Sequence, residues 1–208
     1  MRTLTKEMQA NLSPEKAVQL LKDGNQRFVD NLKFNRNFLQ QVNETSDGQY
    51  PFAVILSCID SRTSAELIFD QGLGDIFSCR IAGNVLNDDI LGSMEFACRL
   101  AGSKVVVILG HTKCGAVKGA CHNVKLGNLT ALLDKLHPAI EEASQGKSDC
   151  DTSDPVFMKE VGRLNVHHVM SEIPKRSQVL AEMLKSSEIA LIGGMYDVDT
   201  GRVSFYEE

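Results

Sequence analysis

The sequence lacks several features that would define other classes of protein. No segment approaches the roughly 20 consecutive apolar residues of a membrane helix, and residues 1–7 are too polar for a signal peptide. Basic residues are not in excess, since the formal net charge is -5, which disfavours a nucleic-acid partner. There is neither an internal repeat nor a low-complexity linker. We therefore expect one cytoplasmic domain, residues 1–208, with no membrane and no nucleic-acid partner.

Disulfides are a further expected absence. In a reducing compartment, the six cysteines are more typical of metal ligands, reactive thiols or core residues than of disulfides. Cys79, Cys98 and Cys121 lie within or next to apolar segments, which is typical of core thiols. Cys150 lies in a polar segment and is interpreted as an exposed thiol, either inert or oxidisable.

Hydrophobic periodicity predicts an alternation of strands and helices. Strands are expected over residues 50–57, 75–81, 105–109 and 189–193, with a closing hairpin over 195–206. Helices are expected over residues 14–31, 64–71, 88–101, 115–119, 126–142, 157–170 and 175–184, and irregular structure over 35–49 and 144–154. This order predicts an α/β fold with a mainly parallel central sheet flanked by helices. A C-terminal antiparallel edge hairpin and an N-terminal helical arm, residues 1–34, complete it.

Two short polar clusters follow two of the predicted strands. The first is Ser57–Arg62, after an apolar run, and the second is Gly110–Gly115, after another. Because ligands bind at the carboxyl ends of parallel strands, we expect Cys58, His111 and Cys114 to meet at one sheet edge. Two thiolates and an imidazole favour zinc over magnesium or calcium, and three protein ligands leave a fourth position for water.

The first cluster also carries a carboxylate and a guanidinium two residues apart. Asp60 and Arg62 are close enough to pair through two hydrogen bonds and so to control the fourth position of the metal. A lone Cys-x-Asp or His-x-x-Cys pair would more often be a buried thiol and a core histidine. Their joint occurrence after two predicted strands favours zinc. A structural zinc site would normally be closed by four Cys or His ligands, whereas the nearest fourth candidate here is a carboxylate that pairs with an arginine.

Cys-x-Asp-x-Arg followed by His-x-x-Cys resembles the β-class carbonic anhydrases. The resemblance extends to Gly24–Phe28, Arg80–Asn84, Gly110–Gly119 and Gly194–Asp197. It implies a carbonate dehydratase, a zinc lyase that reversibly hydrates carbon dioxide to bicarbonate and a proton through zinc-bound hydroxide. It also implies assembly into homodimers or homotetramers.

The resemblance also implies roles for single residues. Asp60 would accept the hydrogen of the hydroxide, while Arg62 would keep Asp60 ionised and turned away from the metal. Members regulated by bicarbonate through a closed form use a tryptophan, and this sequence has none. Gln49 matches a glutamine that binds substrate in the plant-like subgroup, and Phe77 matches an aromatic residue that lines the pocket of that subgroup. Phe96 stands at a position where the subgroup often has tyrosine. The resemblance therefore implies the plant-like, open-site subgroup, and two thiolate ligands predict an alkaline activity optimum.

Two other functions fit parts of the pattern. The same site could hydrolyse a related small linear molecule such as carbon disulfide, with access to the pocket deciding between substrates. A non-catalytic zinc-binding or redox-sensing protein on the same fold would depend on its thiols rather than on turnover. The combination of Cys58, Asp60, Arg62, His111 and Cys114 with a matching glutamine argues against this last reading.

Overall fold

A five-stranded sheet forms the centre of the computed structural model, which describes residues 3–145 and 150–206. The strands lie in the order β2-β1-β3-β4-β5. Their bounds are β1 Ala53–Ser57, β2 Ile76–Arg80, β3 Val105–His111, β4 Ala190–Tyr196 and β5 Val203–Phe205. Strands β1 to β4 are parallel, and β5 pairs antiparallel with β4 at the edge. The predicted mainly parallel sheet with an antiparallel edge is confirmed.

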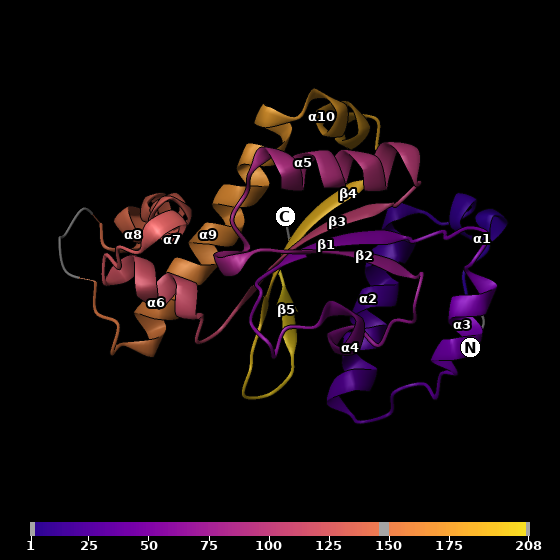
Figure 1. Cartoon of the computed structure of the whole chain (residues 1–208), viewed down its shortest axis with the longest axis horizontal. Helices are drawn as coiled ribbons and strands as arrows, with labels where there is room; N and C mark the ends of the chain where they lie inside the picture. The colour runs from indigo at the N-terminus through magenta and orange to yellow at the C-terminus, as the bar shows by residue number, and fades with distance from the viewer. Residues whose placement is uncertain (1–2, 146–149, 207–208) are drawn as a thin grey trace.

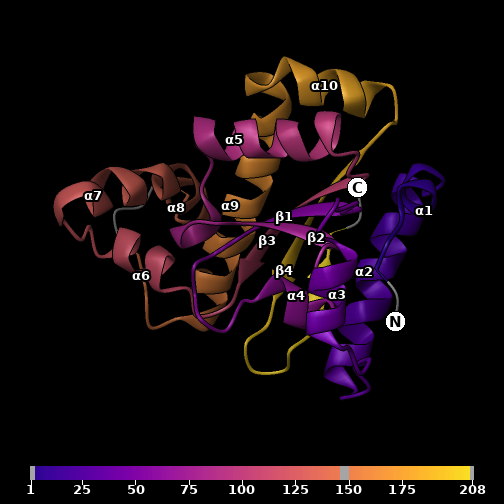
Figure 2. The same ribbon diagram turned by 45° about the vertical axis from the view of Figure 1, so that its right-hand side comes forward.

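Helices cover both faces and both ends of this sheet (Figure 1). Their bounds are α1 Lys6–Ala10, α2 Pro14–Val29, α3 Phe38–Glu44, α4 Ala65–Ile68, α5 Asp88–Glu95, α6 Gly115–Cys121, α7 Gly127–Leu133, α8 His137–Ala143, α9 Pro155–Arg176 and α10 Gln178–Lys185. Helices α5 and α10 lie over one face, α2 and α4 lie on the other side, and α6 to α8 lie beyond one end (Figure 2). Within the described residues, no helix has the length and apolar character needed to cross a membrane.

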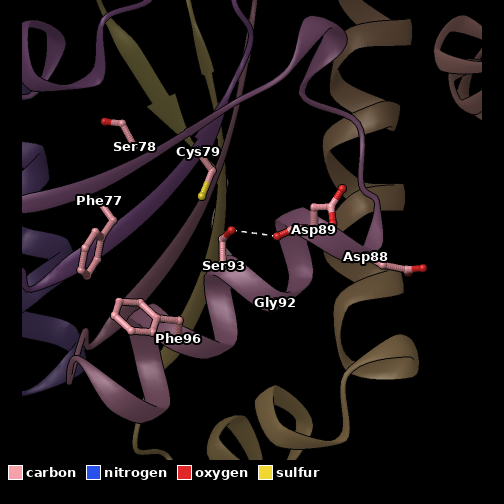
Figure 3. Close-up of a pocket in the computed structure, with 8 residues that line it drawn as sticks. All are labelled: Phe77, Ser78, Cys79, Asp88, Asp89, Gly92, Ser93 and Phe96. Carbon is pink, nitrogen blue, oxygen red and sulfur yellow. Dashed lines mark hydrogen bonds between the residues drawn. The ribbon is translucent and has the colours of Figure 1, made fainter. Parts of the chain in front are cut away.

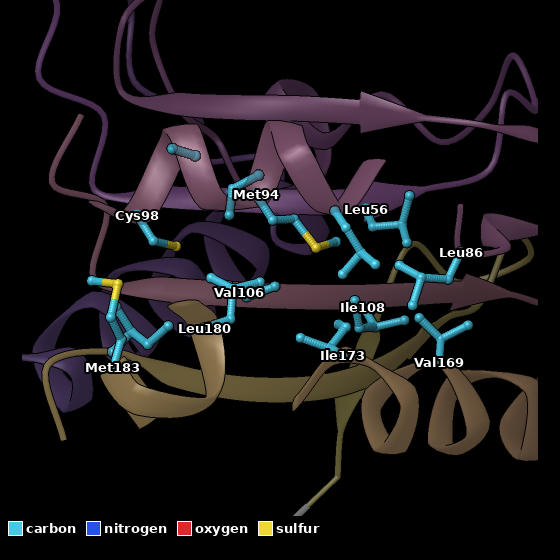
Figure 4. Close-up of a cluster of buried hydrophobic side chains, with 14 of the residues drawn as sticks. Leu56, Leu86, Met94, Cys98, Val106, Ile108, Val169, Ile173, Leu180 and Met183 are labelled. Atoms are coloured by element: carbon cyan, nitrogen blue, oxygen red, sulfur yellow. The ribbon is translucent and has the colours of Figure 1, made fainter. Parts of the chain in front are cut away.

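Successive side chains of a strand point to opposite faces of the sheet, and helices cover both faces here, so the central strands are buried on both sides. Leu56 and Val106 pack with α5, α9 and α10 in one core, which Figure 4 shows. Ile55 and Val107, each next in sequence to one of these, pack on the other face with Leu21 of α2 and with residues around α4. The continuous apolar runs of the sequence therefore correspond to strands covered on both sides.

The strand register places the two polar clusters beside each other. Ser57, the last residue of β1, pairs with Leu109 of β3, so the residues that follow reach the same edge of the sheet. A third apolar cluster, formed with helices α6 to α9, surrounds this edge and includes Cys58 and Cys114. Cys58, His111 and Cys114 are thus buried at this edge, whereas Arg62 and Lys113 of the same clusters are exposed.

The expected irregular segment over residues 35–49 is wrong in part, because it contains helix α3. Asn37 begins this helix by accepting a hydrogen bond on its side chain from the backbone N–H of Gln40. Gln41 is buried and accepts from the backbone N–H of Leu73, which joins the helix to the chain before β2. Most of this segment is exposed, as expected of a surface connection, and Gln41 is its one buried residue.

The expected break before Pro174 is also wrong, because α9 continues through this proline to Arg176. The proline lies in the last turn of the helix, which ends two residues after it. The chain leaves the helix at Ser177, whose side chain accepts from the backbone N–H of Leu180 and caps α10. The expected single helix over 126–142 is likewise divided, since the 3-10 turn Asp134–Leu136 separates α7 from α8.

The expectation that the cysteines form no disulfide is wrong. Cys121, the last residue of α6, is bonded to Cys150, with a Cα–Cα distance of 5.6 Å. His122 and Thr152 add a hydrogen bond of 2.8 Å beside it. Cys121 is therefore not a free core thiol, and Cys150 is not a free thiol. The return of the chain toward α9 brings together two residues that are 29 positions apart.

Candidate metal centre

Cys58, His111 and Cys114 meet at the carboxyl edge of the sheet. Cys58 directly follows β1, His111 ends β3, and Cys114 precedes the first residue of α6. Their ligand atoms all lie within 4.8 Å of one another, and all three residues are buried. The structure thus brings together the three residues that the sequence predicts as metal ligands.

The environment of His111 fits a metal ion. Its Nδ1 lies 2.9 Å from the carbonyl oxygen of Thr112, and because a carbonyl only accepts, Nδ1 carries the hydrogen. Nε2 then presents a lone pair, yet it is buried without a hydrogen-bond partner among the described residues. A histidine that ligates a metal through one nitrogen commonly donates from the other to a carbonyl in this way. With two sulfur atoms beside it, this donor set fits zinc.

The two thiols differ in their hydrogen bonds. The neighbouring thiol of Cys114 is the main cause of a lowered pKa at Cys58, and the backbone N–H of Gly83 lowers it further. That N–H lies 3.3 Å from the Cys58 sulfur. The pKa of Cys114 is raised because its own thiol donates to Cys58 and because it is buried. The backbone N–H of Gly83 thus favours the thiolate form of Cys58.

Asp60 and Arg62 form the two-bonded ion pair that the sequence predicts. Nε of Arg62 donates to Oδ1 of Asp60 at 2.9 Å, and Nη2 donates to Oδ2 at 2.8 Å. The backbone N–H of Arg62 also donates to Oδ1, at 2.9 Å. The side-chain hydrogen bond from Arg62 is the largest cause that holds the pKa of Asp60 well below its usual range. Asp60 is therefore a carboxylate at neutral pH.

Two further residues hold this loop, and sequence reasoning gave them no role in the site. Arg80 donates from Nε to the carbonyl of Cys58 at 3.1 Å and from Nη2 to the carbonyl of Asp60 at 2.6 Å. Thr63 donates from its hydroxyl to the same two carbonyls, at 3.0 and 2.8 Å. The only signal for Arg80 was its place in the Arg80–Asn84 match, which gives no indication of these contacts.

An apolar pocket of about 450 Å³ opens beside the metal centre. Cys58 and Asp60 form its polar side. The rest of the lining is Ile59, Ala82, Gly115, Ala116, Gly119, Val124, Leu129 and Leu133. Such a lining favours a small neutral molecule over a charged one, because it offers few hydrogen-bonding groups to replace lost water.

The three residues predicted to bind substrate lie elsewhere in the chain. Gln49 is exposed and precedes β1, at the opposite end of that strand from Cys58. Phe77 and Phe96 meet edge to face, with ring centroids 6.1 Å apart, in a separate pocket of about 690 Å³ that Figure 3 shows. None of the metal-binding residues lines this pocket. The chain does not bring these three residues to its own metal centre, and their roles stay predictions.

Fold and site together define an α/β protein with a Cys-His-Cys metal centre at the carboxyl edge of a mainly parallel sheet. Comparison with known proteins agrees with this class. The family model described as "Carbonic anhydrase" matches residues 53–203. Carbonic anhydrase 2 of Mycobacterium tuberculosis is 34% identical over 201 residues, which cover 92% of each chain.

Solved structures agree with the sequence comparison. The β-carbonic anhydrase CafA of Aspergillus fumigatus has a TM-score of 0.71 at 30% identity, over 81% of both chains. A β-carbonic anhydrase of Sordaria macrospora has the same TM-score, 0.71, at 22% identity, over 78% of this chain and 84% of that one. The chain belongs to the carbonic anhydrase family and has the fold of the β class. The predicted carbonate dehydratase, which reversibly hydrates carbon dioxide, is confirmed at this level.

Proposed function

We propose that residues 1–208 form one zinc-binding domain in which Cys58, His111 and Cys114 hold the ion for carbon dioxide hydration. The observation that carries the proposal is the buried, unpartnered Nε2 of His111 in a cluster whose ligand atoms, one from each of the three residues, all lie within 4.8 Å of one another. When bound, zinc lowers the pKa of water at its open position and so supplies the nucleophile, as in carbonic anhydrases generally. The protein supplies the rest: an apolar pocket for the substrate and a carboxylate beside the centre.

Asp60 would orient the nucleophile. Both of its oxygens accept hydrogen bonds from Arg62, but a carboxylate has further lone pairs that can accept an O–H. By accepting that hydrogen, Asp60 would turn a lone pair of the attacking oxygen toward the carbon of carbon dioxide. Arg62 would keep Asp60 ionised and engaged away from the metal ligands. This arrangement supports the open-site subgroup that the resemblance implies.

The apolar pocket supports carbon dioxide as the substrate that enters from solvent. Carbon dioxide is small, linear and uncharged, so entering this lining costs it little hydration. Carbon disulfide shares these properties, and the pocket alone does not separate the two. An assay with both molecules therefore belongs to the test.

We further propose that the chain assembles into homodimers or homotetramers through the face around β2. Within the described residues, β2 pairs only with β1, so its other edge is open, and open strand edges in natural proteins are usually covered or protected. Phe96 is half exposed and Leu100 is 75% exposed on the neighbouring helical segment. The Sordaria macrospora structures are described as tetrameric. In such an assembly Gln49, Phe77 and Phe96 would contact substrate in the partner's pocket.

Stopped-flow measurement of carbon dioxide hydration tests the function. Zinc-loaded protein should hydrate carbon dioxide, and protein stripped of zinc by a chelator should lose this activity and regain it on zinc addition. Hydration that is the same with and without zinc would contradict the proposal. Turnover of carbon disulfide alone would assign the same centre to hydrolysis instead.

A further inference from the structure

The turn Ala82–Asn84 contacts the metal centre through a single backbone group. Gly83 has a φ of +68°, in the left-handed region that favours glycine, and it donates its N–H to the sulfur of Cys58 at 3.3 Å. A Cβ at this position would lie 3.2 Å from side-chain atoms of Ala116 and Leu136. Backbone conformation and close packing therefore both require glycine where the N–H meets the sulfur.

The other side of Gly83 is held by a residue far away in the sequence. Asn165, on α9, donates from Nδ2 to the carbonyl oxygen of Gly83 at 2.9 Å. Asn165 is only 3% exposed. The neighbouring positions Leu164 and Val166 are buried and apolar. Burying a side-chain amide among apolar residues is unfavourable unless the amide is hydrogen bonded, so the contact with Gly83 accounts for a polar residue at this position.

We propose that Asn165 is a positioning residue of the metal centre, acting through Gly83 on Cys58. By fixing the Gly83 carbonyl, Asn165 keeps the Gly83 N–H directed at the sulfur. A hydrogen bond to a thiolate withdraws electron density from it, so this contact sets how strongly Cys58 donates to the bound metal. The inference rests on the proposed function only in that the three ligands bind a metal ion.

The variant Asn165→Leu removes the amide and nearly preserves the side-chain volume. In cobalt(II)-substituted protein, the thiolate-to-cobalt charge-transfer band should move to lower energy, because Cys58 becomes a stronger donor. Zinc affinity, measured by competition with a chelator at neutral pH, should nevertheless fall about 10-fold, because the more basic Cys58 thiolate binds a competing proton more tightly and is less firmly oriented. Neither readout depends on turnover.

Asn25→Leu is the matched control. Asn25 is also a buried asparagine, 4% exposed, and donates from Nδ2 to the carbonyls of Ile68 and Gly201 at 3.1 and 2.9 Å. It lies outside the metal centre, so its loss should lower stability and leave the cobalt band unchanged. An equal band shift in both variants would overturn the proposal, since general loosening of the fold would then explain it.

A measurement on the cadmium-113 form tests the contact itself. In the unsubstituted protein, the Gly83 amide proton should show scalar coupling to the metal through the N–H···S hydrogen bond, and this coupling should weaken in Asn165→Leu. If Asn165→Leu does not fold, Asn165→Asp keeps the shape and replaces the donor with an acceptor. A missing coupling in the unsubstituted protein, or an unchanged coupling and band in a folded variant, would overturn the inference. Failure of the proposed function would instead appear as zinc-loaded protein that does not hydrate carbon dioxide.

Discussion

Asp60 and Asp70 are both carboxylates paired with arginine, but they differ in burial and in how far along the sequence their arginine partners lie. Asp60 pairs with Arg62, two residues away, and the side chains are 18% and 50% exposed. Asp70 pairs with Arg27 and Arg36, and its own side chain is only 1% exposed. An exposed local pair contributes little to stability, whereas breaking a buried pair leaves an uncompensated charge in the interior. The comparison teaches that two ion pairs of the same chemistry have different roles. The Asp60 pair orients a carboxylate beside the metal centre, whereas the Asp70 pair stabilises the fold.

The Asp70 cluster joins the N-terminal arm to the rest of the molecule. Arg27 lies on α2, Arg36 lies just before α3, and Asp70 follows α4. Asp70 also accepts a hydrogen bond from the backbone N–H of Phe34, at 3.3 Å. One carboxylate therefore ties α2 and the connection between α2 and α3 to the chain after α4, in contrast to the single loop that contains Asp60 and Arg62.

The largest expected effect on rate is that of Asp60→Asn. The amide keeps the shape and can still bind near Arg62, but the loss of the carboxylate should lower kcat by about 1,000-fold, within the range found for a positioned proton acceptor. Zinc content and thermal stability should change little. Stopped-flow hydration and metal analysis provide the measurements.

Asp199→Asn is the control, because Asp199 forms an exposed pair with Lys113 near the same edge. Equal activity of Asp60→Asn and the unsubstituted protein would refute the role of Asp60.

The largest expected effect on stability is that of Asp70→Asn. Two arginines would lose their buried partner, so the free energy of unfolding should fall by about 3 kcal/mol, while the activity of the folded fraction stays the same. Denaturant unfolding and hydration assays measure the two quantities. Asp30→Asn, an exposed carboxylate on the same arm that accepts from Gln26, should change stability far less. A matching loss in both variants would remove the distinction between the buried and the exposed carboxylate.

A smaller effect is expected for Arg62→Lys, which keeps the charge and removes the two-bonded geometry. Activity should fall about 10-fold because Asp60 is held less firmly, and stability should change little because the pair is exposed. The control Arg99→Lys changes an exposed pair with Glu188 that lies away from the site. Full activity of Arg62→Lys would show that charge alone suffices to hold Asp60.

The smallest expected effect is a dependence of stability on acid. Burial by itself would raise the pKa of Asp70, but the hydrogen bonds from Arg27 and Arg36 outweigh it and lower the pKa below the unfolded value. The stabilisation is therefore complete above the unfolded pKa, at about pH 4, and is lost as the pH falls through the folded pKa. The stability difference between the unsubstituted protein and Asp70→Asn should narrow below about pH 4. A difference that is constant from pH 7 to pH 3 would contradict this reading.

The sequence was sufficient to predict that the three candidate metal ligands meet, because their positions depend on local patterns. Cys58 and His111 each stand at the end of an apolar strand, and parallel strands bring their carboxyl ends to one edge. Asp60 and Arg62 are two residues apart, so their pairing is also local. These predictions required no knowledge of how distant segments pack.

The contacts that the sequence did not predict depend on distant packing. Asn165 reaches Gly83 across 82 positions, and Asp70 meets Arg27 across 43. The Cys121–Cys150 disulfide joins residues 29 positions apart, and the type of compartment does not indicate which thiols the fold brings together. No periodicity or spacing rule encodes which helix lies beside which turn.

A crystal structure of the zinc-loaded protein at pH 8 tests the central claim most directly. The account predicts zinc bound by Cys58, His111 and Cys114, a solvent molecule as the fourth ligand, and Asp60 still paired with Arg62. A structure in which Asp60 leaves Arg62 and occupies the fourth position on zinc would contradict it.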